Sequence, residues 1–445
     1  MRVIIIGAGK IGYHVAEVLV QENHDVVVIE NDEERAKALE EELDIQVIYG
    51  SGSSVSSLQE AGVDEAGLLV AVTESDEVNM ISCILAKQYG VRKTVARVRN
   101  PEYIADEKNK EGLFAKIDLL INPELVTARE IVKVIHFPEA LDVEYFASGQ
   151  VQLAEIRIPP EAPIAQKQLK ELGLGFPCII AAILRKEKMM IPHGNDIIQP
   201  NDIIFIMSRT RDFRVEQLLG SEKRKPQKVM ILGGDQISYY LAKFLEKRRI
   251  AVKIIEKNYD RCTEIADKLE NVLVLHGDGT DIDLLKEEGA GDTDVFVCLT
   301  DDDKLNLLVS LLAKHLGTKR TIAQVRRSDY IRLMESVGID VGVSPRLLTA
   351  NAILRFVKKG RNIISATLLS EARAEMLELV VPGKAKIANK MLKDINLPQQ
   401  AIIGSINRNK QVIIPTGADY IYPGDILTVF CLAAYVNKIE EYFNR

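Results

Sequence analysis

The chain has 445 residues, of which 47% are hydrophobic and 27% are charged, a balance typical of soluble globular proteins with more than one domain. Aromatic residues make up only 5% and tryptophan is absent, which argues against sugar-stacking sites and against stacking platforms for single-stranded nucleic acid. The formal net charge of −7 has the wrong sign for a general polyanion binder, so we expect no nucleic-acid partner.

The N-terminal part of the chain alternates short apolar runs with helical patterns. Strands are predicted at 3–6, 25–30, 46–49, 68–72, 94–98 and 119–121. Helices are predicted from the glycine-rich stretch 7–12 onward, over 32–43, around Leu58, and from a cap at Ser75 or Asp76 to residue 88. This alternation predicts a doubly wound parallel sheet of the Rossmann type with right-handed crossovers.

The pattern changes after Asn122 and Pro123. A helix is predicted to residue 135, and it serves either as a hinge or dimer element or as ordinary packing. The segments that follow are predicted as a strand at 151–158, a helix at 165–172, a hairpin of strands 178–184 and 188–191 around 185–187, and a strand at 202–207. They predict a small α+β domain.

The second half of the chain repeats the first. Aligned identical pairs run in order through both halves: Gly7 with Gly233, Glu30 with Glu256, Gly50 with Gly277, Thr73 with Thr300, Asn79 with Asn306, Arg99 with Arg326 and Pro123 with Pro345. We therefore expect an α/β protein with two Rossmann domains, each followed by a small α+β domain. The expected bounds are 1–136, 137–220, 228–358 and 359–445, with a polar linker between 220 and 228.

A G-x-G-x-x-G motif provides the main candidate site. It directly follows an apolar strand and opens a helix, and Glu30 closes the next strand, a context that indicates dinucleotide binding. Glycines permit a tight turn, close approach of backbone to a pyrophosphate and close helix packing, while the helix N-terminus supplies donors. Glu30 is expected to accept hydrogen bonds from both ribose hydroxyls, which disfavours NADP. The motif residues are Gly7, Ala8, Gly9, Lys10, Ile11 and Gly12.

Ligands of doubly wound sheets bind beyond the carboxyl ends of the strands. That rule adds five candidates at the ends of strands three, four and five: Ser51, Gly52, Thr73, Glu74 and Arg97. Arg97 could neutralise a phosphate, although a surface salt bridge is nearly as plausible from the sequence.

The second repeat departs from this pattern. Asp235 stands where Gly9 stands in the first repeat, Ser238 replaces Gly12, and Gln324 replaces Arg97. A dinucleotide is therefore expected to bind weakly or not at all, and a neutral or smaller nucleoside ligand remains open. The candidate residues of this second site are Gly233, Gly234, Glu256 and Thr300.

Residues for catalysis or metal binding are hard to find in the sequence. The five cysteines include no C-x-x-C pair, which indicates reduced, cytosolic packing, and the histidines are scattered. His136 and His193 are poor candidates for an acid or base, and we predict no catalytic residues and no metal site. The chain is expected to bind a ligand rather than convert it, with an NAD-dependent oxidoreductase as the alternative and a transcription regulator disfavoured by the acidic charge.

The residues quoted above resemble a known family. Residues 7–12, Glu30, the Val-Ala-Val-Thr-x-x-Asp-x-x-Asn stretch at 70–79 and Ala-Arg-Val-Arg at 96–99 are similar to RCK (KTN) domains, which regulate the conductance of potassium transport systems. The duplicated layout resembles the TrkA family of regulatory subunits of Trk potassium uptake systems.

The resemblance implies a ligand, partners and a location. It implies binding of NAD or NADH, and of ATP, ADP or AMP, at residues 7–12, Glu30, Thr73, Glu74 and Arg97. It implies a homo-oligomeric ring, typically a tetramer, docked on a TrkH- or TrkG-like membrane subunit. The chain would then be cytoplasmic and peripheral on the inner face of the cell membrane, and its ligand would gate potassium flux.

Overall fold

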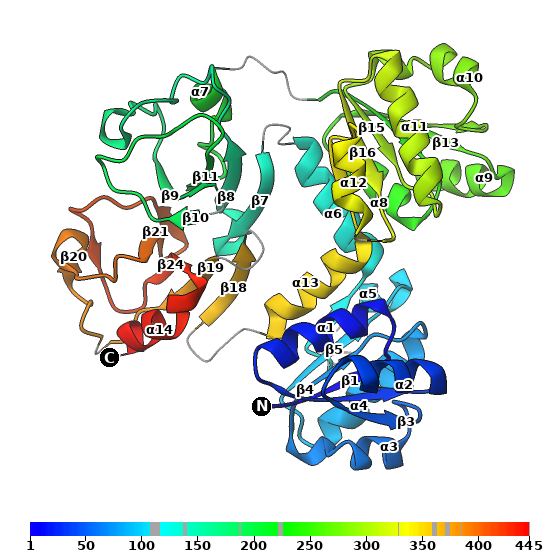
Figure 1. Ribbon diagram of the computed structural model, residues 1–445, viewed down its shortest axis with the longest axis horizontal. Helices are drawn as coiled ribbons and strands as arrows, with labels where there is room; N and C mark the ends of the chain where they lie inside the picture. The colour runs from blue at the N-terminus through cyan, green and yellow to red at the C-terminus, as the bar shows by residue number, and fades with distance from the viewer. Residues whose placement is uncertain are drawn as a thin grey trace. The chain divides into compact units, whose positions relative to one another are not determined.

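The chain divides into two compact units, and each contains a part of both halves of the sequence. The Rossmann unit comprises Met1–Val132 and Pro226–Val357, and the small-domain unit comprises Lys133–Lys225 and Lys358–Arg445. The computed structural model (Figure 1) describes residues 1–106, 116–136, 140–186, 188–220, 226–327, 329–357, 363–369, 374–383 and 385–444.

The first repeat of the Rossmann unit folds around a six-stranded parallel sheet in the order β3-β2-β1-β4-β5-β6. This is the doubly wound order, and the prediction of the fold class is confirmed. The strands are β1 (Arg2–Ile6), β2 (Asp25–Glu30), β3 (Gln46–Tyr49), β4 (Ala66–Ala71), β5 (Lys93–Arg97) and β6 (Leu119–Ile121). The apolar runs of β1, β2, β4 and β5 are buried on both faces, which is why the sequence reveals them clearly.

The helices of the first repeat begin where the sequence provides caps. The Asp32 carboxylate accepts a hydrogen bond from the Arg35 backbone N–H (3.0 Å), and the Ser75 hydroxyl accepts one from Val78 N–H (3.2 Å). Ser75, rather than Asp76, is therefore the cap of its helix. The helices are α1 (Lys10–Gln21), α2 (Glu33–Glu42), α3 (Val55–Glu60), α4 (Asp76–Gln88), α5 (Pro101–Asp106) and α6 (Pro123–His136).

The second repeat of the Rossmann unit has the same architecture, so the predicted duplication is confirmed in the fold. Its parallel sheet has the order β14-β13-β12-β15-β16-β17. The strands are β12 (Lys228–Leu232), β13 (Ala251–Glu256), β14 (Val272–His276), β15 (Val295–Cys298), β16 (Arg320–Gln324) and β17 (Val341–Val343). The helices are α8 (Gln236–Glu246), α9 (Tyr259–Lys268), α10 (Ile282–Glu287), α11 (Asp303–Leu316), α12 (Tyr330–Ser336) and α13 (Pro345–Val357).

A buried asparagine joins two strand ends in each repeat. The Asn79 side chain donates to the carbonyls of Thr73 (3.0 Å) and Arg97 (2.9 Å) and accepts from Thr73 N–H (2.9 Å). Asn306 makes the corresponding bonds in the second repeat. A buried amide left without these partners would cost stability. These hydrogen bonds therefore fix the loop after the fourth strand, where the candidate residues lie.

The two repeats are joined by a helix that crosses between them. α13 of the second repeat packs on α1 of the first, where Ile353 and Leu354 share a buried cluster with Val15 and Leu19. Figure 1 shows the two helices side by side. At the far end of α13 the Lys93 ammonium donates to the Val357 carbonyl (3.1 Å). The core of the first repeat therefore includes a helix that comes from the second repeat.

The small-domain unit contains two similar antiparallel sheets, in the orders β10-β9-β11-β8-β7 and β18-β19-β24-β21-β22. The first has β7 (Ala140–Phe146), β8 (Val151–Arg157), β9 (Cys178–Arg185), β10 (Lys188–Met190), β11 (Ile203–Arg209) and helix α7 (Val215–Leu219). The second has β18 (Ile363–Leu369), β19 (Ala374–Val380), β21 (Ala401–Arg408), β22 (Gln411–Ile413), β24 (Ile426–Leu432), the pair β20 (Lys390–Met391) and β23 (Tyr420–Ile421), and helix α14 (Val436–Asn444). Phe205 and Phe430 meet in their shared core, with ring centroids 5.8 Å apart.

One expectation for the small domain is wrong, and one strand was not predicted. The predicted helix 165–172 is only a 3₁₀ turn at Leu169–Glu171, because backbone N–H groups there donate across the loop to residues 194–198 instead of along a helix. Gln166 also has φ 62°, which an α-helix cannot include. Strand β7 has no counterpart among the predicted elements, although it pairs with β8 along its length.

Candidate functional site

The first glycine turn connects β1 to α1. Gly7 has φ 98°, a left-handed conformation that favours glycine, and a Cβ on Gly12 would lie 1.9 Å from the Gly7 carbonyl oxygen. A Cβ on Gly9 would meet no atom within 4 Å, and no side chain caps α1. The N-terminus of α1 therefore presents backbone donors toward open space, which is the arrangement that binds anions.

Glu30 holds the loops around this turn. Its buried carboxylate accepts hydrogen bonds from the backbone N–H groups of Ala8 (2.5 Å), Asn31 (2.8 Å) and Asp32 (3.0 Å). Two carboxylate oxygens have about four acceptor sites, so capacity for a ribose hydroxyl remains. In the structure Glu30 thus acts first as an anchor of the glycine turn.

Arg97 lies at the end of β5 with only 8% of its surface exposed. One Nη donates to the Thr73 carbonyl (3.1 Å), but Nε is buried without a hydrogen-bond partner, and the guanidinium pairs with no carboxylate of the described residues. Burial, and then the neighbouring Arg99, lower the pKa of Arg97. The guanidinium still remains charged, so a desolvated cation faces the site.

A cavity of about 850 Å³ collects the predicted residues of the first repeat. Gly12 is the exception, because it packs beneath the turn rather than lining the space. The predicted residues that line the cavity are Gly7, Ala8, Gly9, Lys10, Ile11, Glu30, Ser51, Gly52, Thr73, Glu74 and Arg97. The volume is in the range of ordinary cofactor pockets.

The cavity also has lining residues that the sequence did not indicate. Arg35 and Arg99 come from the first repeat, and Arg326 and Arg346 come from the second. Arg99 and Arg326 occupy aligned positions, so the duplication was the available signal for that pair. Arg346 carried no such signal, because its aligned residue in the first repeat is Glu124.

In the second repeat, the side chain of Asp235 covers the helix N-terminus that follows the glycine turn. Asp235 caps α8 by accepting a hydrogen bond from Ser238 N–H (2.9 Å), so its carboxylate occupies the helix N-terminus that stays open at α1. Glu256 accepts from Gly234 N–H (2.5 Å), as Glu30 does from Ala8. None of Gly233, Gly234, Glu256 and Thr300 lines the cavity of the first repeat.

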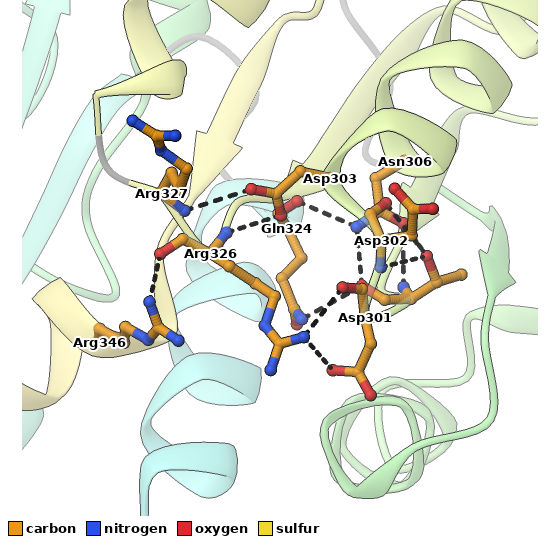
Figure 2. Close-up of polar contacts among 9 residues, drawn as sticks. Asp301, Asp302, Asp303, Asn306, Gln324, Arg326, Arg327 and Arg346 are labelled. Carbon is orange, nitrogen blue, oxygen red and sulfur yellow. Dashed lines mark hydrogen bonds and ion pairs between the residues drawn. The ribbon is translucent and has the colours of Figure 1, made fainter. Parts of the chain in front are cut away.

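In the second repeat, Asp302 and Asp303 accept hydrogen bonds from backbone N–H groups (Figure 2). Asp303 accepts hydrogen bonds from the N–H groups of Arg326 (2.8 Å) and Arg327 (3.3 Å), and Asp302 caps α11. Gln324 donates to the Thr300 carbonyl (3.3 Å). This hydrogen bond corresponds to the one from Arg97 to the Thr73 carbonyl, but its donor is uncharged. The second repeat keeps the framework of the site and lacks its buried cation.

Asp235 should make stability depend on pH. Burial raises the pKa of its carboxyl to about 6, above its ordinary value, so the folded chain holds this proton more tightly than the unfolded chain. Its contribution to the free energy of unfolding is complete below about pH 4 and is lost as pH rises through about 6. Asp235→Asn keeps an acceptor for the helix cap but cannot titrate. Between pH 4 and pH 7, the free energy of unfolding of this variant, measured with urea, should rise relative to that of wild type by on the order of 1 kcal/mol. Parallel curves for both proteins would show that Asp235 does not titrate in this window.

Both the Rossmann segments and the small-domain segments match known domain families. Residues 3–123 and 229–345 match the TrkA-N domain, and residues 153–214 and 376–444 match the TrkA-C domain. The chain belongs to the TrkA family. A relative from Methanosarcina mazei, the Trk system potassium uptake protein TrkA homolog 1, is 41% identical over the full length of both chains. The Trk system potassium uptake protein TrkA of Halomonas elongata is 35% identical over all of this chain and 98% of its own length.

Solved structures share the fold of this TrkA-family chain. A GsuK channel bound to NAD superposes with a TM-score of 0.64 at 18% identity, covering all of this chain and 79% of the channel chain. The GsuK RCK domain gives a TM-score of 0.63 at 19% identity and covers all of this chain and 95% of its own. These structures therefore share the fold of the whole chain, including its tandem arrangement.

The described residues show neither a membrane-spanning helix nor a cluster of metal ligands. None of the helices there has the length and apolar character that a membrane span requires. The same residues bring together no group of three or more His, Cys, Asp or Glu side chains suited to a metal ion.

Proposed function

We propose that this TrkA-family chain is a regulatory subunit that binds NAD(H) or an adenine nucleotide in the first repeat and thereby controls a membrane potassium transporter. The observation that carries the proposal is the cavity at the first glycine turn, where open Gly9 and the uncapped N-terminus of α1 face the desolvated Arg97. A phosphate is the ligand group that would satisfy both at once.

The proposed ligand lies along the ends of the parallel strands. Its pyrophosphate or phosphate chain contacts the backbone of residues 7–12 and the Arg97 guanidinium. The ribose hydroxyls meet the remaining acceptor sites of Glu30, and Ser51, Gly52, Thr73 and Glu74 line the rest of the cavity. The second-repeat residues Gly233, Gly234, Glu256 and Thr300 form at most a weak site, because Asp235 blocks the corresponding turn.

Regulation requires that the ligand bind two conformations with different affinity. The cavity is lined by both repeats of the Rossmann unit, including Asp235 and Arg326 of the second. A bound nucleotide would therefore favour one arrangement of the repeats over another. In the proposed assembly a ring of several chains, typically a tetramer, passes this change to the membrane subunit.

The proposed partner is a TrkH- or TrkG-like potassium transporter subunit. The relatives named above are Trk system potassium uptake proteins, which supports this choice. The chain would sit in the cytoplasm, peripheral to the inner face of the membrane, and act through its four domains at 1–136, 137–220, 228–358 and 359–445. It would bind no nucleic acid.

We propose that the site binds without catalysis. None of the described residues that line the cavity is His or Cys, and Lys10 is an exposed side chain at the start of α1. An NAD-dependent oxidoreductase would need a positioned proton donor beside the nicotinamide. Turnover of NADH by the purified chain with candidate carbonyl substrates would favour that alternative.

Flux measurements test the proposal directly. The chain and the Trk-type membrane subunit of the same cell are purified together and reconstituted in liposomes, and potassium flux is followed with and without NADH, ATP, ADP and AMP. The proposal predicts co-purification and a nucleotide-dependent change in flux. A stable complex whose flux ignores every nucleotide, or the lack of any complex, contradicts it.

A further inference from the structure

Arg346 belongs to the second repeat but lines the cavity of the first. It is the second residue of α13, the helix that packs along α1. The C-terminal end of α13 lies at the start of β5, where Lys93 donates to the Val357 carbonyl. The N-terminal end with Arg346 therefore lies at the opposite edge of the sheet, where the glycine turn begins α1.

The charge at this position differs between the repeats. In the first repeat Glu124 follows Pro123, and its carboxylate pairs with the Arg99 guanidinium (Nε–Oε1 3.2 Å). In the second repeat Arg346 follows Pro345, and its Nη1 donates to the backbone carbonyl of Arg326 (2.9 Å), as Figure 2 shows. An arginine–carboxylate pair in one repeat is thus replaced by two neighbouring arginines in the other.

This arginine pair is only partly neutralised. Burial, and then the charge of Arg326, lower the pKa of Arg346, while the Asp303 carboxylate acts in the opposite direction. Arg346 forms no ion pair with a carboxylate of the described residues. Arg326 approaches Asp301 at 3.8 Å, but the Asp301 side chain is 90% exposed, so that contact is weak. Two like charges brought together at a cavity wall are costly unless an anion joins them.

We propose that Arg346 of the second repeat contacts the terminal phosphate of a nucleotide held at the first glycine turn, and that the site therefore prefers nucleoside triphosphates to monophosphates. This inference rests on the proposed function, since it needs a nucleotide in that cavity. Arginine suits the role because its planar guanidinium binds phosphate oxygens in a bidentate manner. Arg346 acts here as a specificity-determining residue.

The corresponding helix of the first repeat also reaches the other repeat. Glu124, at the start of α6, lies close enough to α8 of the second repeat to contribute, after burial, to the raised pKa of Tyr240. Glu124 and Asp235 line the same cavity as Arg346, so its wall carries carboxylates as well as arginines.

Calorimetry with the full chain tests this assignment. Affinities for ATP and AMP are measured for wild type, Arg346→Gln and Arg346→Lys, with Arg248→Gln as the matched control on an exposed arginine of the second repeat. Losing a charge-assisted hydrogen bond to phosphate should weaken ATP binding of Arg346→Gln by about 10- to 100-fold. AMP binding should change by less than about twofold, Arg346→Lys should fall between, and Arg248→Gln should match wild type.

The outcomes separate this inference from the proposed function. If wild type binds no nucleotide, the proposed function fails and this inference fails with it. If wild type binds ATP but Arg346→Gln binds it equally well, or loses ATP and AMP to the same extent, only the role of Arg346 is overturned. A circular dichroism melt shows whether a variant is folded, and Arg346→Lys provides the comparison should Arg346→Gln be unstable.

Discussion

Replacing Gly9 by aspartate should abolish nucleotide binding while the chain stays folded. Gly9 has φ −62° and open space around its Cβ position, so an L-residue fits there without strain. The second repeat supplies the precedent, because Asp235 at the aligned position caps α8 in the same extended conformation. The new carboxylate would occupy the N-terminus of α1 and repel a pyrophosphate, at a cost of about 4 kcal/mol for unit charges 4 Å apart near a protein surface.

The expected loss of affinity is at least about 100-fold for NADH and ATP by calorimetry, and the nucleotide response of potassium flux should disappear. Stability should be unchanged or higher by a few tenths of a kcal/mol, since Asp is a good N-cap and Gly a fair one. Gly9→Asn is the matched control, because it has the same size and caps the helix without charge, and it should lose less affinity. Full binding by the Gly9→Asp variant would place the ligand elsewhere.

Arg97→Gln is the second change with a large expected effect. It gives the first repeat the residue that the second repeat has at position 324, where Gln324 still donates to the carbonyl after the fourth strand. The hydrogen bond to Thr73 should therefore survive, and only the buried charge is removed. Losing a charge-assisted contact to phosphate should weaken nucleotide binding by about 10- to 100-fold.

The matched control for this variant is Arg92→Gln, which removes one exposed positive charge from the loop before β5, away from the cavity. Calorimetry should show wild-type affinity for the control and a clear loss for Arg97→Gln, with equal urea midpoints for all three proteins. Equal loss in both variants would mean that net charge, rather than contact with Arg97, drives binding.

Parallel strands and helix caps were predictable from this sequence because local residues determine them. Strands such as β1 and β4 are continuous apolar runs, and Ser75 stands directly before a helical pattern. Segment 165–172 misled the prediction, because its backbone pairs with a loop nearly thirty residues farther on, and no local pattern carries that information. β7 was missed even though Asp142 and Glu144 alternate with apolar residues, which is a pattern typical of a half-buried strand.

The candidate site was predictable where one repeat supplies it. The glycine turn, Glu30, Thr73 and Arg97 follow from strand ends and a known spacing, and the structure places them around one cavity. The contribution of Arg326 and Arg346 depends on α13 crossing to the first repeat, which is a long-range packing event. The anchoring of Glu30 by backbone N–H groups was equally hidden, since it depends on loop geometry.

A crystal structure of the chain grown with NADH tests the central claim most directly. The account predicts density for an intact dinucleotide whose pyrophosphate lies against Gly7–Gly12 and whose phosphate oxygens meet Arg97, with no comparable density at the turn that contains Asp235. An empty first cavity at saturating NADH, or a dinucleotide bound only at the second turn, would contradict it.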